Sequence, residues 1–269
     1  MKSPKAIGLI AGGGDLPLAF AEQARARGYS LKVAAIQGEA SPRLARRGDS
    51  LRWISIGQLG SLISFFKKEK VHQTVMQGRV RHDRIFKDLK FDLRALALLA
   101  RTKNRSGETL LKAVAGELTR QGIQIRDSRF LMEEYLIQEG IPTRTKPNLR
   151  ERASIQYSLP LARQLARAGI GQVLAVKNSA VAAVEAMEGT NEVIRRAGQV
   201  AGKGFILIKT ASPRQDWRFD VPTLGMKTLE NLARAGAAGL VAEAGRTFLL
   251  EKEKTIAFAD RHGLFIQAL

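Results

Sequence analysis

The residue types best suited to chemistry gather in residues 216–222, which read Asp-Trp-Arg-Phe-Asp-Val-Pro. Asp220 is the central residue, because the Val-Pro pair after it is held extended and ends any helix there. A carboxylate at such a loop mouth can hold a metal ion or a polarised water molecule. The alternative is structural: Asp220 caps the helix that follows or pairs with Arg218.

Two further turns carry carboxylates. Residues 185–192 read Glu-Ala-Met-Glu-Gly-Thr-Asn-Glu, and residues 242–246 read Ala-Glu-Ala-Gly-Arg. Thr190 suits a helix N-cap, but capping does not account for the preceding Glu188. Together with Asp220, these turns and Glu243 resemble the rim of one site.

These turns need a sheet to position them. An apolar strand at 6–10, a Gly-rich turn, a helix ending at 27–28 and a strand at 31–36 open the chain. This order predicts a parallel, doubly wound α/β sheet with its ligand at the carboxyl ends of the strands. The N–H groups of Gly12, Gly13 and Gly14 are candidates to receive a phosphate, although three glycines also suit a plain tight turn.

The chain of 269 residues alternates strands and helices throughout and predicts two α/β domains. We place an N-terminal Rossmann-like domain at 1–140, a linker at 141–152 and a C-terminal catalytic domain at 153–269. The segment 79–105 carries nine basic and three acidic residues among regularly spaced apolar ones. We expect a helix there that is basic on one side and apolar on the other, as suits an anionic membrane surface, an amphiphilic ligand or the protein's own core.

The net charge of +19 indicates anionic partners but does not choose among phosphates, nucleic acid and a bilayer surface. Two alternatives therefore stay open. A nucleotide- or NAD(P)-binding oxidoreductase fits the opening turn, although G-x-G-x-x-G spacing is missing. A nucleic-acid-binding protein fits the charge, but no binding motif is present and we expect no specific nucleic acid partner.

With no cysteine and only three histidines, any metal must be held by oxygen atoms or by few histidines. That favours a hard cation such as Mg²⁺. The first residues do not form a signal peptide, and no run approaches the length of about 20 apolar residues that a spanning helix needs. We expect a soluble, cytoplasmic protein.

Four pieces of sequence resemble the LpxI-type UDP-2,3-diacylglucosamine pyrophosphatases of lipid A biosynthesis. They are Ile-Gly-Leu-Ile-Ala-Gly-Gly-Gly-Asp-Leu-Pro at 7–17, Glu-Ala-Met-Glu-Gly-Thr-Asn at 185–191, Arg-Phe-Asp-Val-Pro-Thr-Leu-Gly at 218–225 and Ala-Glu-Ala-Gly-Arg at 242–246. The likeness runs nearly end to end, in order and spacing. The Phe-Asp-Val-Pro and Glu-Gly-Thr pieces are the most specific.

The resemblance implies an Mg²⁺-dependent hydrolase that cuts UDP-2,3-diacylglucosamine to UMP and 2,3-diacylglucosamine 1-phosphate. It implies that water attacks the phosphorus on the sugar side, with Asp220 essential, and that the ligand lies in a cleft between two α/β domains. It also implies a homodimer, and we expect peripheral contact with the inner face of the cytoplasmic membrane. Arg218 and Lys209 are our candidates for phosphate contacts, and residues 85–99 for an acyl channel.

The expected metal ligands are Asp220, Glu188 and Glu243. The expected substrate-binding positions are Gly12, Gly13, Gly14, Asp15, Glu188, Gly189, Thr190, Lys209, Arg218 and Thr223. Two positions depart from the family pattern. Asn191 stands where aspartate is usual, and Gly107-Glu108 stands where an acid pair is usual. An amide at 191 can still coordinate a cation, but with lower affinity.

Overall fold

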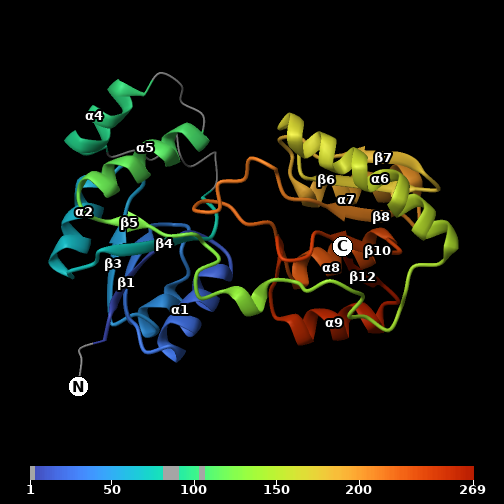
Figure 1. The fold of residues 1–269 in the computed structure, drawn as a ribbon, viewed down its shortest axis with the longest axis horizontal. Coiled ribbons are helices and arrows are strands. Elements are labelled where there is room, and N and C mark those ends of the chain that lie inside the picture. Colours follow the sequence, from blue (N-terminus) through green and yellow to red (C-terminus); the bar gives the residue numbers. More distant parts are fainter. Residues whose placement is uncertain (1–3, 81–90, 103–106) are drawn as a thin grey trace. The chain divides into compact units, whose positions relative to one another are not determined.

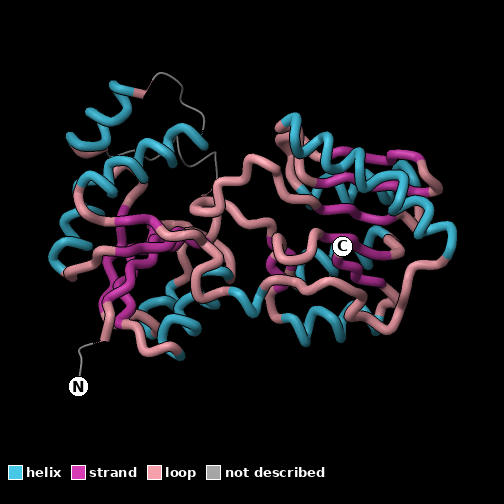
Figure 2. The backbone as a smooth tube through the Cα atoms, viewed as in Figure 1, coloured by secondary structure: helices cyan, strands magenta, loops and turns pink. Residues whose placement is uncertain are grey.

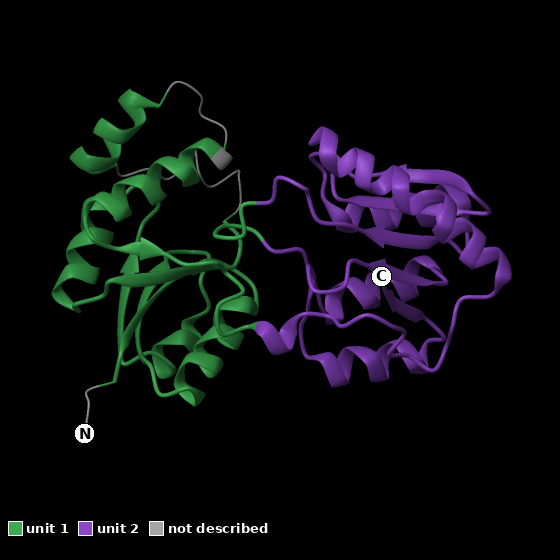
Figure 3. Cartoon of the chain, viewed as in Figure 1, with its two compact units in different colours: residues 1–132, 216–220 green, residues 133–215, 221–269 purple. Residues whose placement is uncertain are grey.

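The computed structural model describes residues 4–80, 91–102 and 107–269 (Figure 1). The chain forms two compact units. Unit 1 comprises Met1–Met132 and Asp216–Asp220, and unit 2 comprises Glu133–Gln215 and Val221–Leu269 (Figure 3). The expected α/β fold with a parallel N-terminal sheet and a second α/β body is confirmed.

The boundary between the units lies at Met132, and the predicted linker 141–152 falls inside unit 2. Gly140 and Ala268 form a backbone bridge, and Thr143 accepts a hydrogen bond from the N–H of Ile266 at 3.0 Å. The two prolines that suggested a linker therefore mark a segment bound to the edge of the second sheet. The chain also returns once to unit 1, through residues 216–220.

Unit 1 is built on five parallel strands in the order β3-β2-β1-β4-β5. Figure 2 draws the strands in magenta. Its strands are β1 (Ala6–Ala11), β2 (Ser30–Ile36), β3 (Ser50–Ile54), β4 (Gln73–Gln77) and β5 (Gln124–Ile125). Its helices are α1 (Leu16–Ala26), the 3-10 helix η1 (Pro42–Arg46), α2 (Leu59–Lys68), α4 (Leu93–Arg101) and α5 (Gly107–Arg120). Parallel strands read as continuous apolar runs because helices cover both faces.

The helix predicted across 79–105 is wrong at its start. Arg79 forms an antiparallel bridge with Gly13, and α4 begins only at Leu93. The Asp92 side chain caps α4 by accepting from the Ala95 N–H at 2.9 Å. Residues 81–90, where part of the proposed acyl channel falls, lie outside the described residues.

Unit 2 has a mixed sheet in the order β12-β10-β8-β6-β7, in which β6 is antiparallel to both neighbours. Its strands are β6 (Val173–Lys177), β7 (Ala180–Val184), β8 (Ile206–Lys209), β10 (Gly239–Ala242) and β12 (Phe265–Ala268), with β9 (Thr223–Leu224) and β11 (Phe248–Leu249) paired separately. Its helices are η2 (Glu133–Tyr135), α6 (Leu149–Ala168), α7 (Thr190–Ala201), α8 (Met226–Ala235) and α9 (Lys252–Arg261).

The unit 2 core lies on both faces of this sheet. Along β8, Ile206 and Ile208 pack with α6, whereas Leu207 packs in the cluster that contains residues of α7, α8 and α9. This alternation follows from the two-residue period of a strand, and along β8 the polar residue, Lys209, stands at the end. Among the described residues, no helix combines the length and the apolar character needed to cross a bilayer.

Candidate active site

The Gly-rich turn is fastened to the end of β4. The Gly12 N–H donates to the Gln77 carbonyl at 2.8 Å, and the Gly13 N–H donates to the Arg79 carbonyl at 2.8 Å. A Cβ at Gly12 would lie 2.7 Å from the Arg79 oxygen, so only glycine fits there. Close packing thus requires glycine at position 12, and the N–H groups of both Gly12 and Gly13 already have acceptors.

Gly14 and Asp15 form the exposed part of this turn. Gly14 has a φ of +94°, and no described residue has an atom within 4 Å of a Cβ built on it. Asp15 is the N-cap residue of α1 and makes no side-chain capping bond. Of the predicted phosphate contacts in this turn, Gly14 and Asp15 are therefore the positions open to a ligand.

The predicted motif around Asp220 also belongs to unit 1, through residues 216–220. Residues 216–220 form a turn in which the Phe219 and Asp220 N–H groups both donate to the Asp216 carbonyl, at 3.0 and 3.3 Å. Phe219 packs against the unit 1 core that contains residues of α2 and α5. Asp220 is exposed at the end of this anchored turn.

Ser128 holds the backbone just before Asp220. Its N–H donates to the Trp217 carbonyl at 2.7 Å, and its hydroxyl lies 2.9 Å from the Arg218 carbonyl and 2.9 Å from the Met76 carbonyl. The Gln77 side-chain amide donates to the Ser128 carbonyl at 2.6 Å. Ser128 is 2% exposed and Gln77 is 3% exposed, so these bonds are shielded from water.

Gln77 therefore connects the two motifs that the sequence analysis singled out. Its carbonyl accepts from Gly12, and its side chain holds Ser128, which in turn holds residues 217 and 218. The Gly-rich turn and the Asp220 turn both attach to the carboxyl end of β4. This is the edge at which parallel α/β sheets bind ligands.

Two arginines near this edge, Arg218 and Arg129, already have partners. The Arg218 guanidinium donates to Asp216 at 2.9 and 2.7 Å and lies over the Phe219 ring, and Arg129 lies over the Trp217 ring, 4.2 Å from its centroid. The hydrogen bonds from Arg218 hold the pKa of Asp216 below its ordinary value and raise the pKa of Arg218. Arg218, predicted to contact phosphate, thus first serves to brace the turn.

In unit 2, β7, β8, β10 and β12 point the same way, because β6 runs antiparallel between β7 and β8. Their carboxyl ends therefore share one edge of the sheet. Glu185 follows β7, Lys209 ends β8, and Glu243 follows β10. The predicted Glu188, Thr190, Lys209 and Glu243 thus belong to one edge of unit 2, whereas Asp220 belongs to unit 1.

Thr190 is the first residue of α7, and Gly189, with a φ of +80°, takes the N-cap position predicted for Thr190. Glycine suits this cap because its backbone is in the left-handed region. The Thr190 hydroxyl donates to Glu185 at 2.9 Å and lies 3.4 Å from the Lys209 amine. Glu185 also accepts from the Gln172 N–H at 3.0 Å.

Glu188 is paired with Arg196 at 3.1 Å and accepts from the Ala186 N–H at 3.1 Å. Hydrogen bonds from its own N–H and from Ala186, together with the Arg196 charge, lower the pKa of Glu188. Thr223 donates its hydroxyl to the Val221 carbonyl at 2.8 Å, and Asn191 accepts from Asn231 at 3.0 Å.

Glu243 is 5% exposed, and both carboxylate oxygens have donors. Arg163 donates to one at 2.9 Å, and the Ala211 N–H donates to the other at 2.9 Å. Arg246 lies 3.8 Å from the second oxygen. Glu243 therefore fixes the loop that leaves β8, which leads directly to residues 216–220.

These contacts bear on the predicted metal ligands. Within the described residues, no group of three or more His, Asp or Glu side chains is arranged to hold a metal ion. Glu188 and Glu243 would each have to give up an arginine and an N–H donor to bind a cation. The donor set of unit 2 does not fit Mg²⁺ as it stands, and Asp220, the third predicted ligand, belongs to unit 1.

Sequence reasoning missed Gln77, Ser128 and Arg129. A signal was present: Asp127-Ser128-Arg129-Phe130 repeats the Asp-x-Arg-Phe pattern of residues 216–219. In both copies the arginine bonds to the aspartate two residues earlier. Nothing in the sequence indicates that the two copies lie against each other.

The fold and these edges define a two-unit α/β protein with polar side chains at the carboxyl ends of both sheets. Comparison with known families identifies it further. The LpxI N-terminal domain family matches residues 6–135, and the LpxI C-terminal domain family matches residues 138–267. The chain belongs to the LpxI family.

A relative from Caulobacter vibrioides, named UDP-2,3-diacylglucosamine pyrophosphatase LpxI, is 34% identical over 272 residues. The match covers 97% of this chain and 96% of the relative. Among solved structures, glycinamide-RNase-transformylase T from Mycobacterium tuberculosis aligns with 68% of this chain and 44% of its own, at 12% identity and a TM-score of 0.26.

Proposed function

We propose that the protein hydrolyses the pyrophosphate bond of UDP-2,3-diacylglucosamine, giving UMP and 2,3-diacylglucosamine 1-phosphate. Family membership across both units and the name of the Caulobacter relative support this activity. The observation that carries it at the residue level is the meeting of the Gly-rich turn and the Asp220 turn at the end of β4. The substrate, a lipid, implies peripheral contact with the cytoplasmic membrane, and we further propose a homodimer.

We assign Asp220 the essential role. Its turn is braced by Ser128, by the Asp216–Arg218 pair and by the packing of Phe219, while its own carboxylate is exposed. A carboxylate held in this way can orient water for in-line attack at phosphorus or bind a cation. Gly14 and Asp15, in the exposed part of the neighbouring turn, are positioned to contact the sugar or its phosphates.

Mg²⁺ is proposed as the cofactor, with Asp220 as a ligand. Mg²⁺ commonly binds through one or two carboxylates plus substrate phosphates and keeps several waters, so it does not require a three-carboxylate cluster. When bound, it would neutralise charge on the diphosphate. Lys209, at the carboxyl edge of the unit 2 sheet, is kept as a proposed phosphate contact.

The test compares the wild-type protein with Asp220→Asn and with Glu253→Gln, which removes an exposed carboxylate from α9. Each is incubated with UDP-2,3-diacylglucosamine, with and without Mg²⁺, and UMP is measured by mass spectrometry. We expect Asp220→Asn to lose about 100-fold or more in rate, as removal of a group that acts in the transition state does. Equal rates for the two variants would contradict the role of Asp220, and no UMP from the wild type would contradict the activity.

A further inference from the structure

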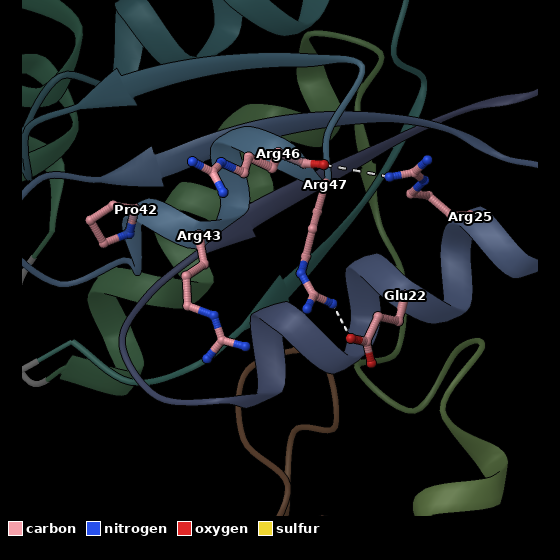
Figure 4. A pocket seen from close by; sticks show the side chains of 6 residues that line it. All are labelled: Glu22, Arg25, Pro42, Arg43, Arg46 and Arg47. Carbon is pink, nitrogen blue, oxygen red and sulfur yellow. Dashed lines mark hydrogen bonds and ion pairs between the residues drawn. The ribbon is translucent and has the colours of Figure 1, made fainter.

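A basic pocket lies on unit 1 between α1 and η1 (Figure 4). Its volume is about 830 Å³, within the range of small-ligand sites. The lining residues are Glu22, Arg25, Pro42, Arg43, Arg46 and Arg47. Four arginines and one glutamate thus line a single depression.

Local contacts hold the backbone of η1, which carries Arg43 and Arg46. Ser41 caps η1 by accepting from the Arg43 N–H at 3.3 Å, Pro42 occupies the first turn, and Leu44 is fully buried. Arg43 and Arg46 therefore both rise from one short, capped helix, and their backbones have little freedom to move apart.

Glu22, which supplies the single carboxylate among the lining residues, already forms an ion pair. Glu22 pairs with Arg47, and Arg25 lies 3.5 Å from the Arg46 carbonyl (Figure 4). In the part of the chain that the structure describes, the guanidinium groups of Arg43 and Arg46 have no carboxylate within ion-pair distance. Like charges that line one pocket repel each other, and a bound anion relieves that repulsion.

Guanidinium groups bind phosphate oxygens in pairs, through parallel N–H donors. We infer that this pocket binds an anion carrying two or more phosphate groups, with Arg43 and Arg46 as its main contacts. The ligand would be a soluble diphosphate or the headgroups of anionic phospholipids, which share this chemistry. An open nucleic acid strand fits less well, because the arginines surround a compact depression.

This pocket is separate from the candidate active site. Helix α1 begins at Leu16, after the carboxyl end of β1, and runs back along the sheet to Ala26. Glu22 and Arg25 lie in its second half, toward the amino ends of the strands. The Gly-rich turn and the Asp220 turn attach at the opposite, carboxyl end of β4.

The test uses the full-length chain, a double variant Arg43→Gln with Arg46→Gln, and a control Arg150→Gln with Arg152→Gln. The control removes two exposed charges near the start of α6 in unit 2 and gives the same net charge. At physiological salt, we would titrate each protein with inorganic pyrophosphate by calorimetry. We would also measure flotation with phosphatidylcholine vesicles, with and without phosphatidylglycerol, and binding of a single-stranded oligonucleotide.

We expect the pocket variant to bind its ligand about tenfold more weakly or worse, since hydrogen bonds to charged groups are lost. The control should bind like wild type, and UMP release should be unchanged in both variants. Selective loss of pyrophosphate binding identifies a soluble ligand, and selective loss of phosphatidylglycerol-dependent flotation identifies a headgroup. Equal losses in the pocket and control variants, an effect confined to the oligonucleotide, or no binding of any probe would overturn the inference.

Discussion

At the residue scale, several contacts hold the turn of residues 216–220 in place, whereas Asp220 itself is exposed. Ser128 contributes an N–H and a hydroxyl to the two carbonyls at residues 217 and 218. The Asp216–Arg218 pair closes the turn from within. A catalytic group gains from such preorganisation because little entropy is lost when it acts.

Ser128→Ala should therefore reduce kcat by about 10- to 100-fold, because small displacements of a reacting group are costly. KM should stay close to the wild-type value, since Ser128 is buried and serves only to position the turn. Ser158→Ala is the matched control, because Ser158 is a fully buried serine whose hydroxyl also bonds to a backbone carbonyl. Equal kcat in the two variants would exclude a positioning role for Ser128.

Asp216→Asn should be less stable than wild type at neutral pH, and the difference should close in acid. The folded-state pKa of Asp216 is lowered by Arg218, so its stabilisation is present above the unfolded value of about 3.9 and is lost as pH falls below it. We expect a gap of at most about 1 kcal/mol, because the pair is partly exposed. Urea unfolding followed by Trp217 fluorescence in a Trp53→Phe background measures it, and a gap that persists at pH 2.5 would contradict the assignment.

At the element scale, the turn after β1 explains what its glycines do. Gly12 packs so closely against Arg79 that any side chain collides with backbone. Of the three glycines, only Gly14 has no described atom within 4 Å of an added Cβ. The sequence predicted this β-turn-α unit correctly, but the requirement for glycine at position 12 depends on the residues after β4, more than 60 positions away.

Gly12→Ala should destabilise unit 1 by about 1–3 kcal/mol, as overpacking of a close contact does. Gly116→Ala offers the contrast. Gly116 is exposed within α5, with no described atom within 4 Å of a new Cβ, and alanine there should stabilise by about 0.5–1 kcal/mol. The urea unfolding midpoints of both variants, each compared with the wild type, measure these two effects. A Gly12→Ala protein as stable as wild type would show that the contact with Arg79 is not tight.

At the scale of the whole molecule, periodicity and turn residues were enough to predict two α/β bodies and most element positions. They failed where a segment acts far from its sequence neighbours. Residues 216–220 follow a unit 2 strand in sequence yet complete unit 1, because Phe219 and the carbonyls of residues 217 and 218 find partners there. Glu188 and Glu243 have the residue type of metal ligands, but each is paired with an arginine, and the partner of Glu243, Arg163, lies on a helix 80 residues earlier.

The most direct measurement of the central claim is hydrolysis of UDP-2,3-diacylglucosamine in water enriched in ¹⁸O, with both products weighed by mass spectrometry. We predict that the label enters 2,3-diacylglucosamine 1-phosphate, that UMP stays unlabelled, and that Asp220→Asn forms neither product at a comparable rate. Label in UMP would place the attack on the other phosphorus. Intact substrate after incubation with the folded wild-type protein and Mg²⁺ would contradict the proposed activity itself.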